Sequence, residues 1–167
     1  MRDLVRARED LRGDLMACRQ RISKLLLRRG LVWPGSGSTW SQRHLSWLGP
    51  VRFDDPLVEL VCSEHLAGHE VLFARRDRLE RAIDERAGAG PWSGLVGRLR
   101  CLRGVATLTA VGLVAEVGGF AAFDRPRRLA SYVGLVPSES STGTRRRQGA
   151  ITKAGSGRAR RLLIEAA

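Results

Sequence analysis

Apolar residues near the N-terminus recur at the spacing of a helical heptad. After a first interval of seven, the intervals alternate between four and three, at Leu4, Leu11, Leu15, Cys18, Ile22 and Leu25. Charged residues occupy most positions between them. This period predicts one amphipathic helix over residues 3–29, whose apolar seam packs against another helix. Because Cys18 lies on the seam, we expect its thiol to be buried rather than reactive.

A second apolar period predicts another long helix from about Asp55 to Ala87, with its seam at Leu57, Val61, Leu72, Leu79 and Ile83. The sequence GAGPW that follows contains helix breakers, so the helix should end there. Two long amphipathic helices joined by a connection predict an antiparallel, coiled-coil-like helical hairpin. We expect copies of the chain to associate through these helices as a homo-oligomer, because an unpaired seam would leave apolar side chains in water.

The connection between the two helices, residues 30–52, is rich in Gly, Pro and Trp, and it predicts a loop that holds one short helix. Trp40 and Trp47 are two helical turns apart, so their indoles should share one face. Stacking on a nucleobase is one use for such a pair. Packing in the core is the interpretation that we favour.

Three potential metal ligands, Cys62, His65 and His69, would lie on one face of the second helix at a spacing that can chelate a metal ion. A tetrahedral site needs a fourth ligand, and the sequence offers none nearby. We therefore predict no metal site here. In this interpretation one histidine lies on the seam and the other at the surface.

The three cysteines, Cys18, Cys62 and Cys101, form an odd and widely spaced set without a CxxC pair. This set suits a reducing cytoplasm rather than a disulfide framework. The longest apolar stretch, residues 105–122, is interrupted by glycines and by Glu116, so it predicts neither a signal peptide nor a membrane span. We expect a soluble, cytoplasmic protein without a membrane partner.

Residues 93–167 predict a small helical domain that follows the helical hairpin of residues 1–92, which makes the chain mainly α. Gly104 and Val105 form a predicted tight turn between the segment at 99–103 and an apolar helix at 107–117. Helix-hairpin-helix elements use such a glycine turn to bring backbone N–H groups close to a phosphate. Gly104 is therefore a candidate nucleic-acid contact, and an ordinary helical hairpin with a glycine turn is the alternative.

The formal net charge is +12, and only Lys24 and Lys153 of the 29 cationic residues are lysine. Such a charge predicts a polyanionic partner, of which DNA is the first candidate. Arginine also binds phosphate in a bidentate manner. An excess of arginine over lysine is equally what a GC-rich genome encodes without selection for DNA binding, so composition leaves both explanations open.

Residues 138–157, SESSTGTRRRQGAITKAGSG, combine hydroxyls, cations and glycines. Attack on a phosphodiester by serine needs an exposed hydroxyl, cations that hold the phosphate, and backbone that can approach closely. This stretch offers all three. A solvated loop beside a solvated basic face is the alternative, and the residues alone favour it.

The next residues predict a helix entered through Ser156, with arginines near its first turns. Cations there oppose the helix dipole unless an anion docks at that end. The candidate nucleic-acid ligands are therefore Arg145, Arg146, Arg147, Lys153, Arg158, Arg160 and Arg161.

The C-terminal residues closely resemble the transposase domain of the insertion sequence 110, 116 and 902 family. The resemblance rests on Phe123, LASYVGLVP at residues 129–137, SSTG at residues 140–143 and RRQGAITKAGSGRARRLL at residues 146–163. This combination of spaced motifs is more specific than any one glycine-rich loop. The two upstream helices are similar to the middle helical region of the same proteins.

The resemblance implies DNA transposition by a transposase that uses a serine of the Ser-Ser/Thr-Gly segment as its nucleophile. It assigns that role to Ser141, with Ser140 in reserve, because Thr142 stands where many relatives have the second serine. It also implies an N-terminal RuvC-like domain that binds Mg²⁺ through acidic residues, and an element-encoded guide RNA as a partner beside DNA.

That acidic domain is not among these residues, so we expect a fragment that holds no cofactor of its own and is inactive alone. Two other functions stay open. The chain could be a nucleic-acid-binding module without catalysis, or an interaction module of a truncated transposase whose helices pair with a full-length relative.

Overall fold

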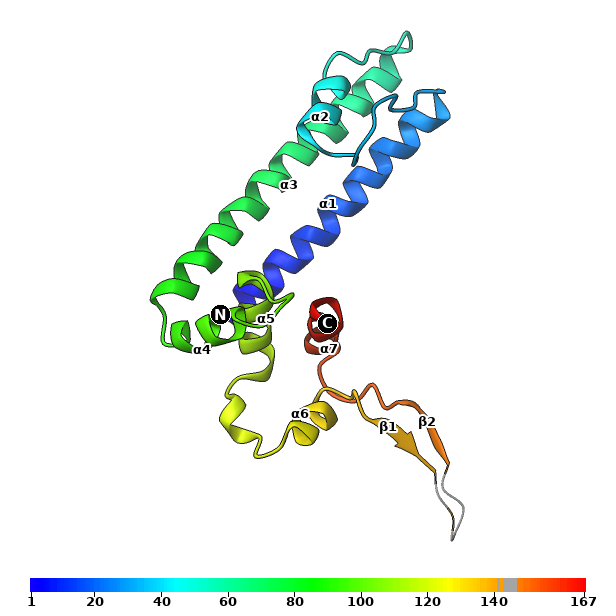
Figure 1. The fold of residues 1–167 in the computed structure, drawn as a ribbon. Helices are drawn as coiled ribbons and strands as arrows, with labels where there is room; N and C mark the ends of the chain where they lie inside the picture. The colour runs from blue at the N-terminus through cyan, green and yellow to red at the C-terminus, as the bar shows by residue number, and fades with distance from the viewer. Residues whose placement is uncertain (141, 143–146) are drawn as a thin grey trace. The chain divides into compact units, whose positions relative to one another are not determined.

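The structure is a computed structural model that describes residues 1–140, 142 and 147–167. Its helices, seen in Figure 1, are α1 (Arg2–Arg28), α2 (Gln42–Leu48), α3 (Pro56–Ala89), α4 (Ser93–Arg100), α5 (Thr107–Val117), the 3₁₀ helix η1 (Phe120–Ala122), α6 (Pro126–Tyr132) and α7 (Gly157–Ala166). Two short strands, β1 (Pro137–Glu139) and β2 (Gln148–Ile151), pair in one antiparallel sheet. The predicted mainly α class is confirmed. The sheet is an addition that the sequence analysis did not anticipate.

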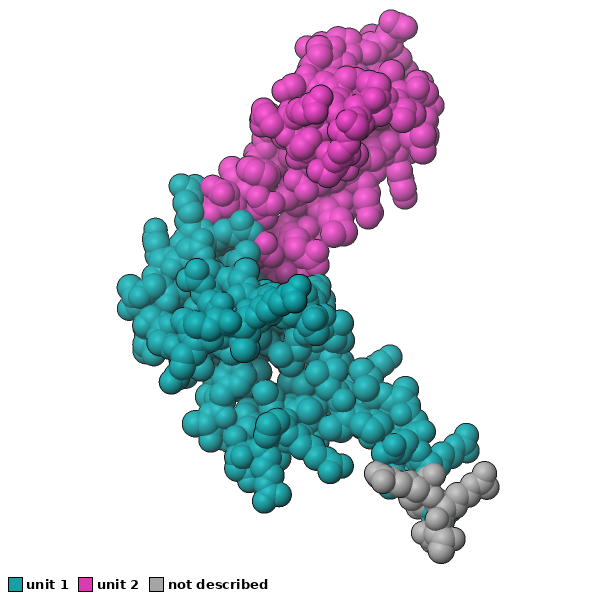
Figure 2. Space-filling view, in the orientation of Figure 1, with its two compact units in different colours: residues 1–7, 79–167 teal, residues 8–78 magenta. Residues whose placement is uncertain are grey.

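The chain forms two compact units, which Figure 2 shows in different colours. Unit 1 comprises residues 1–7 and 79–167, and unit 2 comprises residues 8–78. The domain boundary expected between residues 92 and 93 stays a prediction. In the described part of the chain, no helix combines the length and the apolar character that a membrane span requires.

Unit 2 is held together by the predicted seam of α1, whose residues are buried at Leu11, Leu15, Cys18, Ile22 and Leu25. Leu25 packs against Val58 and Cys62 of α3. Further back along α1, the Sγ atom of Cys18 donates a hydrogen bond to the carbonyl of His65 at 3.4 Å. The contacts on α3 thus move to higher residue numbers as those on α1 move to lower ones, so the two helices run antiparallel within this unit.

The register predicted for the start of α3 is wrong. Leu57 and Val61 are 73% and 46% exposed, whereas Val58 and Cys62 are buried. The buried face continues at His69, which is 4% exposed. The buried face at the start of α3 therefore lies one residue further along the chain than predicted.

His69 is suited to its interior position because its Nε2 atom has a hydrogen-bond partner and its ring has an aromatic neighbour. Its Nε2 atom accepts a hydrogen bond from Nε of Arg19 at 3.2 Å, and its ring stacks on Trp40 at 4.9 Å between centroids. Burial and the positive charge of Arg19 lower the pKa of His69, which favours the neutral imidazole that this hydrogen bond requires.

The predicted short helix between the long ones is confirmed as α2. Trp40 precedes α2 rather than lying on it, and it has a left-handed φ of 68°. Trp40 and Trp47 both contact His44, with ring centroids at 5.2 and 5.6 Å. Both indoles also pack against the buried cluster around Leu48, which supports the core interpretation that the sequence favoured.

Unit 1 is organised around α5, which is buried from Ala110 to Glu116. Ile83 and Ala87 at the end of α3 pack with Val96 of α4 and with α5 in one cluster. The residue after α4, Cys101, is exposed, unlike the two cysteines of unit 2.

Glu116 is the acid that interrupts the apolar sequence of α5, and it joins three parts of unit 1. Its carboxylate accepts hydrogen bonds from Nε and Nη2 of Arg6 at 3.2 and 3.4 Å and from Oγ of Ser156 at 3.0 Å. Nε of Arg2 donates to the carbonyl of Ala115 at 2.9 Å. Burial raises the pKa of Glu116, but the bonds from Arg6 and Ser156 and the nearby positive charges outweigh it and hold that pKa below its ordinary 4.5.

Candidate nucleic-acid interface

The serine- and arginine-rich segment forms part of an exposed β-ribbon. Pro137 pairs with Ile151 and Glu139 pairs with Gln148, with an irregularity between these two pairs. Every residue of both strands is exposed. Figure 1 shows the ribbon extending away from α6 and α7 of the same unit. The ribbon therefore presents both of its faces to solvent and to any partner.

Ser140, which follows β1, and Arg147, which precedes β2, lie opposite each other. The backbone N–H of Ser140 donates to the carbonyl of Arg147 at 2.9 Å, and both residues are exposed. Ser141, Arg145 and Arg146 lie outside the described residues. The structure thus brings the reserve nucleophile together with one of the candidate phosphate ligands.

The base of the ribbon is fixed by backbone hydrogen bonds and by close chain packing. The N–H groups of Thr152 and Lys153 donate to the carbonyls of Val136 and Gly134 at 2.9 and 3.1 Å. Gly155 has a φ of +70°, and a Cβ atom there would collide with the carbonyl oxygen of Tyr132. This position therefore requires glycine for its conformation and for space.

Lys153 itself has a left-handed φ of 56° and an exposed side chain at the ribbon base. The side chain of Arg160 in α7, in contrast, is engaged by backbone carbonyls. Nη1 of Arg160 donates to the carbonyls of Val133 and Ala154 at 2.7 and 3.1 Å. Arg160 therefore ties α7 to the residues from which the ribbon starts, and its proposed contact with phosphate stays a prediction.

α7 begins as predicted, with Ser156 as its N-cap. The Oγ atom of Ser156 accepts a hydrogen bond from the backbone N–H of Ala159 at 3.2 Å. The same oxygen donates to Glu116, which places a carboxylate at this end of the helix. Arg158 and Arg161 are half-buried, and Arg161 pairs with Glu165 at 3.5 Å.

The sequence predicted an anion at the start of α7, where negative charge is favourable to the helix dipole, and the carboxylate of Glu116 is such an anion. The sequence analysis missed it because Glu116 is forty residues from Ser156 along the chain. The sequence did contain one indication, a single acid within an otherwise apolar helix. A buried carboxylate needs polar partners, so Glu116 could be expected to contact distant polar residues.

Gly104 has a φ of +80° in the connection between α4 and α5. A Cβ atom at Gly104 would collide with the carbonyl oxygen of Ala166 in α7, so packing within unit 1 accounts for the glycine. The helix-hairpin-helix-like element and its contact with nucleic acid stay predictions.

The described residues contain no group of three or more His, Cys, Asp or Glu side chains that could hold a metal ion. In unit 2 the imidazole of His69 is engaged by Arg19, and Cys18 donates to the backbone of His65. These contacts give the Cys62–His69 segment a structural role in joining α1 to α3.

Comparison with known proteins assigns the C-terminal segment to a protein family. Residues 96–167 match the profile described as Transposase IS116/IS110/IS902 family, which confirms the resemblance seen in the sequence. A protein of Sinorhizobium fredii that is named as a transposase, y4qE, is 39% identical over 167 residues, which are 100% of this chain and 39% of that protein.

Two further relatives carry the names of mobile elements. The transposase for insertion sequence element IS1533 of Leptospira borgpetersenii is 33% identical over 72% of this chain and 35% of its own length. The transposase for insertion sequence element IS1111A of Coxiella burnetii is 39% identical over 42% of this chain and 19% of its own length. The chain thus spans less than two fifths of the length of the curated relatives that it matches.

Proposed function

We propose, from the match of residues 96–167 to the IS116/IS110/IS902 transposase family, that this chain takes part in DNA transposition by binding DNA and carrying the serine nucleophile. The observation that carries the proposal is the exposed β-ribbon, which presents Ser140 beside Arg147. The major groove of DNA admits a two-stranded ribbon of this kind. The cations at its base and along it would hold phosphates.

The proposed chemistry is transfer of a DNA phosphoryl group to serine. The Oγ atom of Ser141, or of Ser140 in reserve, attacks phosphorus and loses its proton, while the bond from phosphorus to the leaving sugar oxygen breaks and that oxygen takes up a proton. The product is a phosphoserine link between protein and DNA. Arg147 and Lys153 would stabilise the negative charge that develops on the phosphate. Binding of Mg²⁺ belongs to the acidic domain that the family resemblance implies.

The DNA-binding part can be tested without catalysis. Arg147→Ala and Lys153→Ala should each lower the slope of log affinity against log salt by about 0.9 on duplex DNA, because each removes one phosphate contact. Arg98→Ala is the matched control, because Arg98 is an exposed cation on α4. Slopes for both ribbon variants that equal the slope for Arg98→Ala would contradict the proposal.

The nucleophile is best tested after an acidic domain from a close relative has been fused to the chain. In that chimera Ser141→Ala should abolish the covalent protein–DNA adduct while DNA affinity stays nearly unchanged, because the hydroxyl attacks and the cations bind. Loss of the adduct in Ser140→Ala but not in Ser141→Ala would move the role one residue upstream. Normal recombination by both single variants and the double variant would exclude a serine mechanism.

A second candidate function is association between copies of the chain. The α1 seam is covered by α3 within unit 2, so the original reason for association does not hold. Another apolar face of α3 is exposed instead, at Leu57, Leu60, Val61 and Val71. These residues share one side of the helix, and we infer that a second copy of the chain covers them.

Sedimentation equilibrium tests this association. Leu60→Asp should shift the chain toward monomer, whereas Ser63→Asp, which adds the same charge on another side of α3, should not. A wild-type monomer at high protein concentration would contradict the inference.

A further inference from the structure

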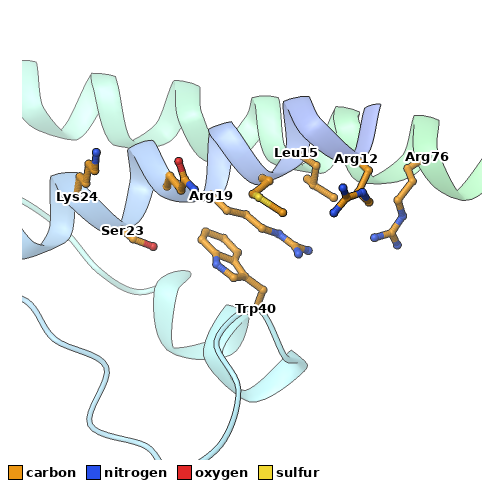
Figure 3. A pocket seen from close by; sticks show the side chains of 9 residues that line it. Arg12, Leu15, Arg19, Ser23, Lys24, Trp40 and Arg76 are labelled. Carbon is orange, nitrogen blue, oxygen red and sulfur yellow. The ribbon is translucent and has the colours of Figure 1, made fainter. Parts of the chain in front are cut away.

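Unit 2 contains a charged groove that the proposed function does not use. Figure 3 shows side chains that line the groove beside α1. The groove has a volume of about 520 Å³. This volume falls within the range of about 300–1,000 Å³ that is typical of small-molecule sites. None of its nine lining residues is acidic, and four are cations: Arg12, Arg19, Lys24 and Arg76.

Two of these cations show that an anion would be favourable in the groove. Burial and the like charge of Arg76 lower the pKa of Arg19, so the two guanidinium groups repel each other in a partly desolvated place. Lys24 is exposed, and no partner for its ammonium group is found among the described residues. A phosphate group would relieve the repulsion and pair with the ammonium.

The remaining part of the groove is apolar and aromatic. The indole of Trp40 lines it, as does Met16, which is 48% exposed. The guanidinium carbon of Arg19 lies 5.2 Å from the centre of the Trp40 ring, in a cation–π contact. Figure 3 shows the indole and the Arg19 side chain close together.

Trp40 reaches this position through a strained backbone. A φ of 68° is unfavourable for a bulky residue that is not glycine, and such strain persists where the surroundings hold the residue in place. Here the stacking on His69 and the contact with Arg19 do so. Strained residues cluster at ligand sites.

We propose that this groove binds one nucleotide of a single-stranded nucleic acid, with its phosphate at Arg19 and Lys24 and its base against Trp40 and Met16. Proteins that bind single strands without sequence preference combine a cationic path for the backbone with an aromatic surface for the bases. The inference rests on the proposed function only in taking nucleic acid as the partner. It concerns unit 2, whereas the β-ribbon belongs to unit 1.

The test uses the full chain and two fluorescent probes, an oligouridylate and an oligothymidylate of about ten nucleotides, a length within the usual site size. Lys24→Ala should lower the salt slope by about 0.7, because one phosphate contact on a single strand is lost. Arg21→Ala removes an exposed cation of the same helix that does not line the groove, and it should leave the slope less affected. Equal effects of the two variants would overturn the phosphate assignment.

The base contact is tested at Trp40. Trp40→Leu should weaken binding by roughly fivefold to a hundredfold, the range for loss of one stacked base, and Trp40→Phe should retain most of the affinity. Circular dichroism checks that each variant keeps its helices. If Trp40→Leu and Lys24→Ala both fold and bind as wild type does, the groove is not a nucleotide site. Competition by inorganic triphosphate as strong as that by unlabelled oligouridylate would overturn the base contact.

Photocrosslinking separates this inference from the proposed function. An oligonucleotide that contains 4-thiouridine should crosslink to peptides of residues 12–24 or to Trp40. Crosslinks confined to residues 137–153 would refute the groove and support the ribbon. Crosslinks confined to the groove would support the inference, and binding of duplex DNA by the ribbon is decided separately by the Arg147→Ala and Lys153→Ala slopes. Similar affinities for the two probes would support a site that contacts only phosphate and base. Binding of oligouridylate alone would show that the site also contacts the ribose 2′-hydroxyl.

Discussion

Replacement of Glu116 by glutamine tests whether the buried carboxylate stabilises unit 1. Glutamine keeps the shape and one carbonyl acceptor for Ser156, but it removes the charge that pairs with Arg6. The Arg6 side chain is 46% exposed, so solvent reduces that pair to less than about 1 kcal/mol. Weakening of the hydrogen bond from Ser156, which now has a neutral acceptor, adds about 1 kcal/mol. We therefore expect the free energy of unfolding of unit 1 to fall by about 1 to 2 kcal/mol near neutral pH.

The effect should depend on pH with a defined sign. The folded-state pKa of Glu116 lies below its ordinary value of 4.5, so its contribution is present above that value and is lost as pH falls through the folded pKa. Glutamine does not titrate in this range. The gap in stability between the wild type and Glu116→Gln should therefore be largest near neutral pH and should shrink in acid.

Urea unfolding followed by two signals measures this change. Circular dichroism reports helices throughout the chain, whereas tryptophan fluorescence reports mainly unit 2, because Trp92 alone of the four tryptophans lies in unit 1. We expect the circular dichroism transition to shift more than the fluorescence transition. Glu165→Gln is the control for charge, since Glu165 is exposed and pairs only with Arg161 in the described structure. A Glu116→Gln variant as stable as Glu165→Gln at neutral pH, or a gap that does not shrink in acid, would refute the reasoning.

Other substitutions test the register of α3 and the ribbon base. In the Leu60→Asp background, where the chain is expected to be a monomer, Val58→Asp should destabilise unit 2 by more than about 3 kcal/mol, because it buries an unpaired charge. Leu57→Asp in the same background should change that stability by less than about 0.5 kcal/mol, and fluorescence-detected urea unfolding compares the two. Arg160→Lys should speed hydrogen exchange at the ribbon base, because an ammonium cannot reproduce the contacts of Nη1 with both carbonyls. Gly155→Ala should cost unit 1 about 2 kcal/mol in thermal or urea unfolding, and wild-type stability would show that the left-handed backbone there can relax.

The sequence predicted the elements whose residues follow a single local rule. The apolar period located α1 and its seam, and the serine that caps α7 marked where that helix begins. The second long helix was also found, and Ile83 of its predicted seam is buried, but the seam was misplaced at the start of the helix, where Val58 and Cys62 are buried. The buried face there continues at a polar residue, His69. Its partners, Arg19 and Trp40, come from distant parts of the chain, so no local pattern could identify them.

The β-ribbon could not be read from the sequence for a different reason. Strands are usually recognised by alternation of buried and exposed residues, and every residue of β1 and β2 is exposed. Serine, glycine and proline also have low strand propensity. The sequence did locate the candidate functional residues in this segment, because the types of residue present, hydroxyls, glycines and arginines, are those that such chemistry needs. What it lacked was the pairing that brings Ser140 opposite Arg147.

The burial of two of the three cysteines makes the unmodified chain suitable for site-specific labelling. Burial raises the pKa of the Cys18 and Cys62 thiols, so each holds little reactive thiolate and is shielded from reagents. Cys101 is exposed at the end of α4. A maleimide dye should therefore attach to unit 1 at one position without any mutation, and its anisotropy would report how that unit tumbles when nucleic acid binds.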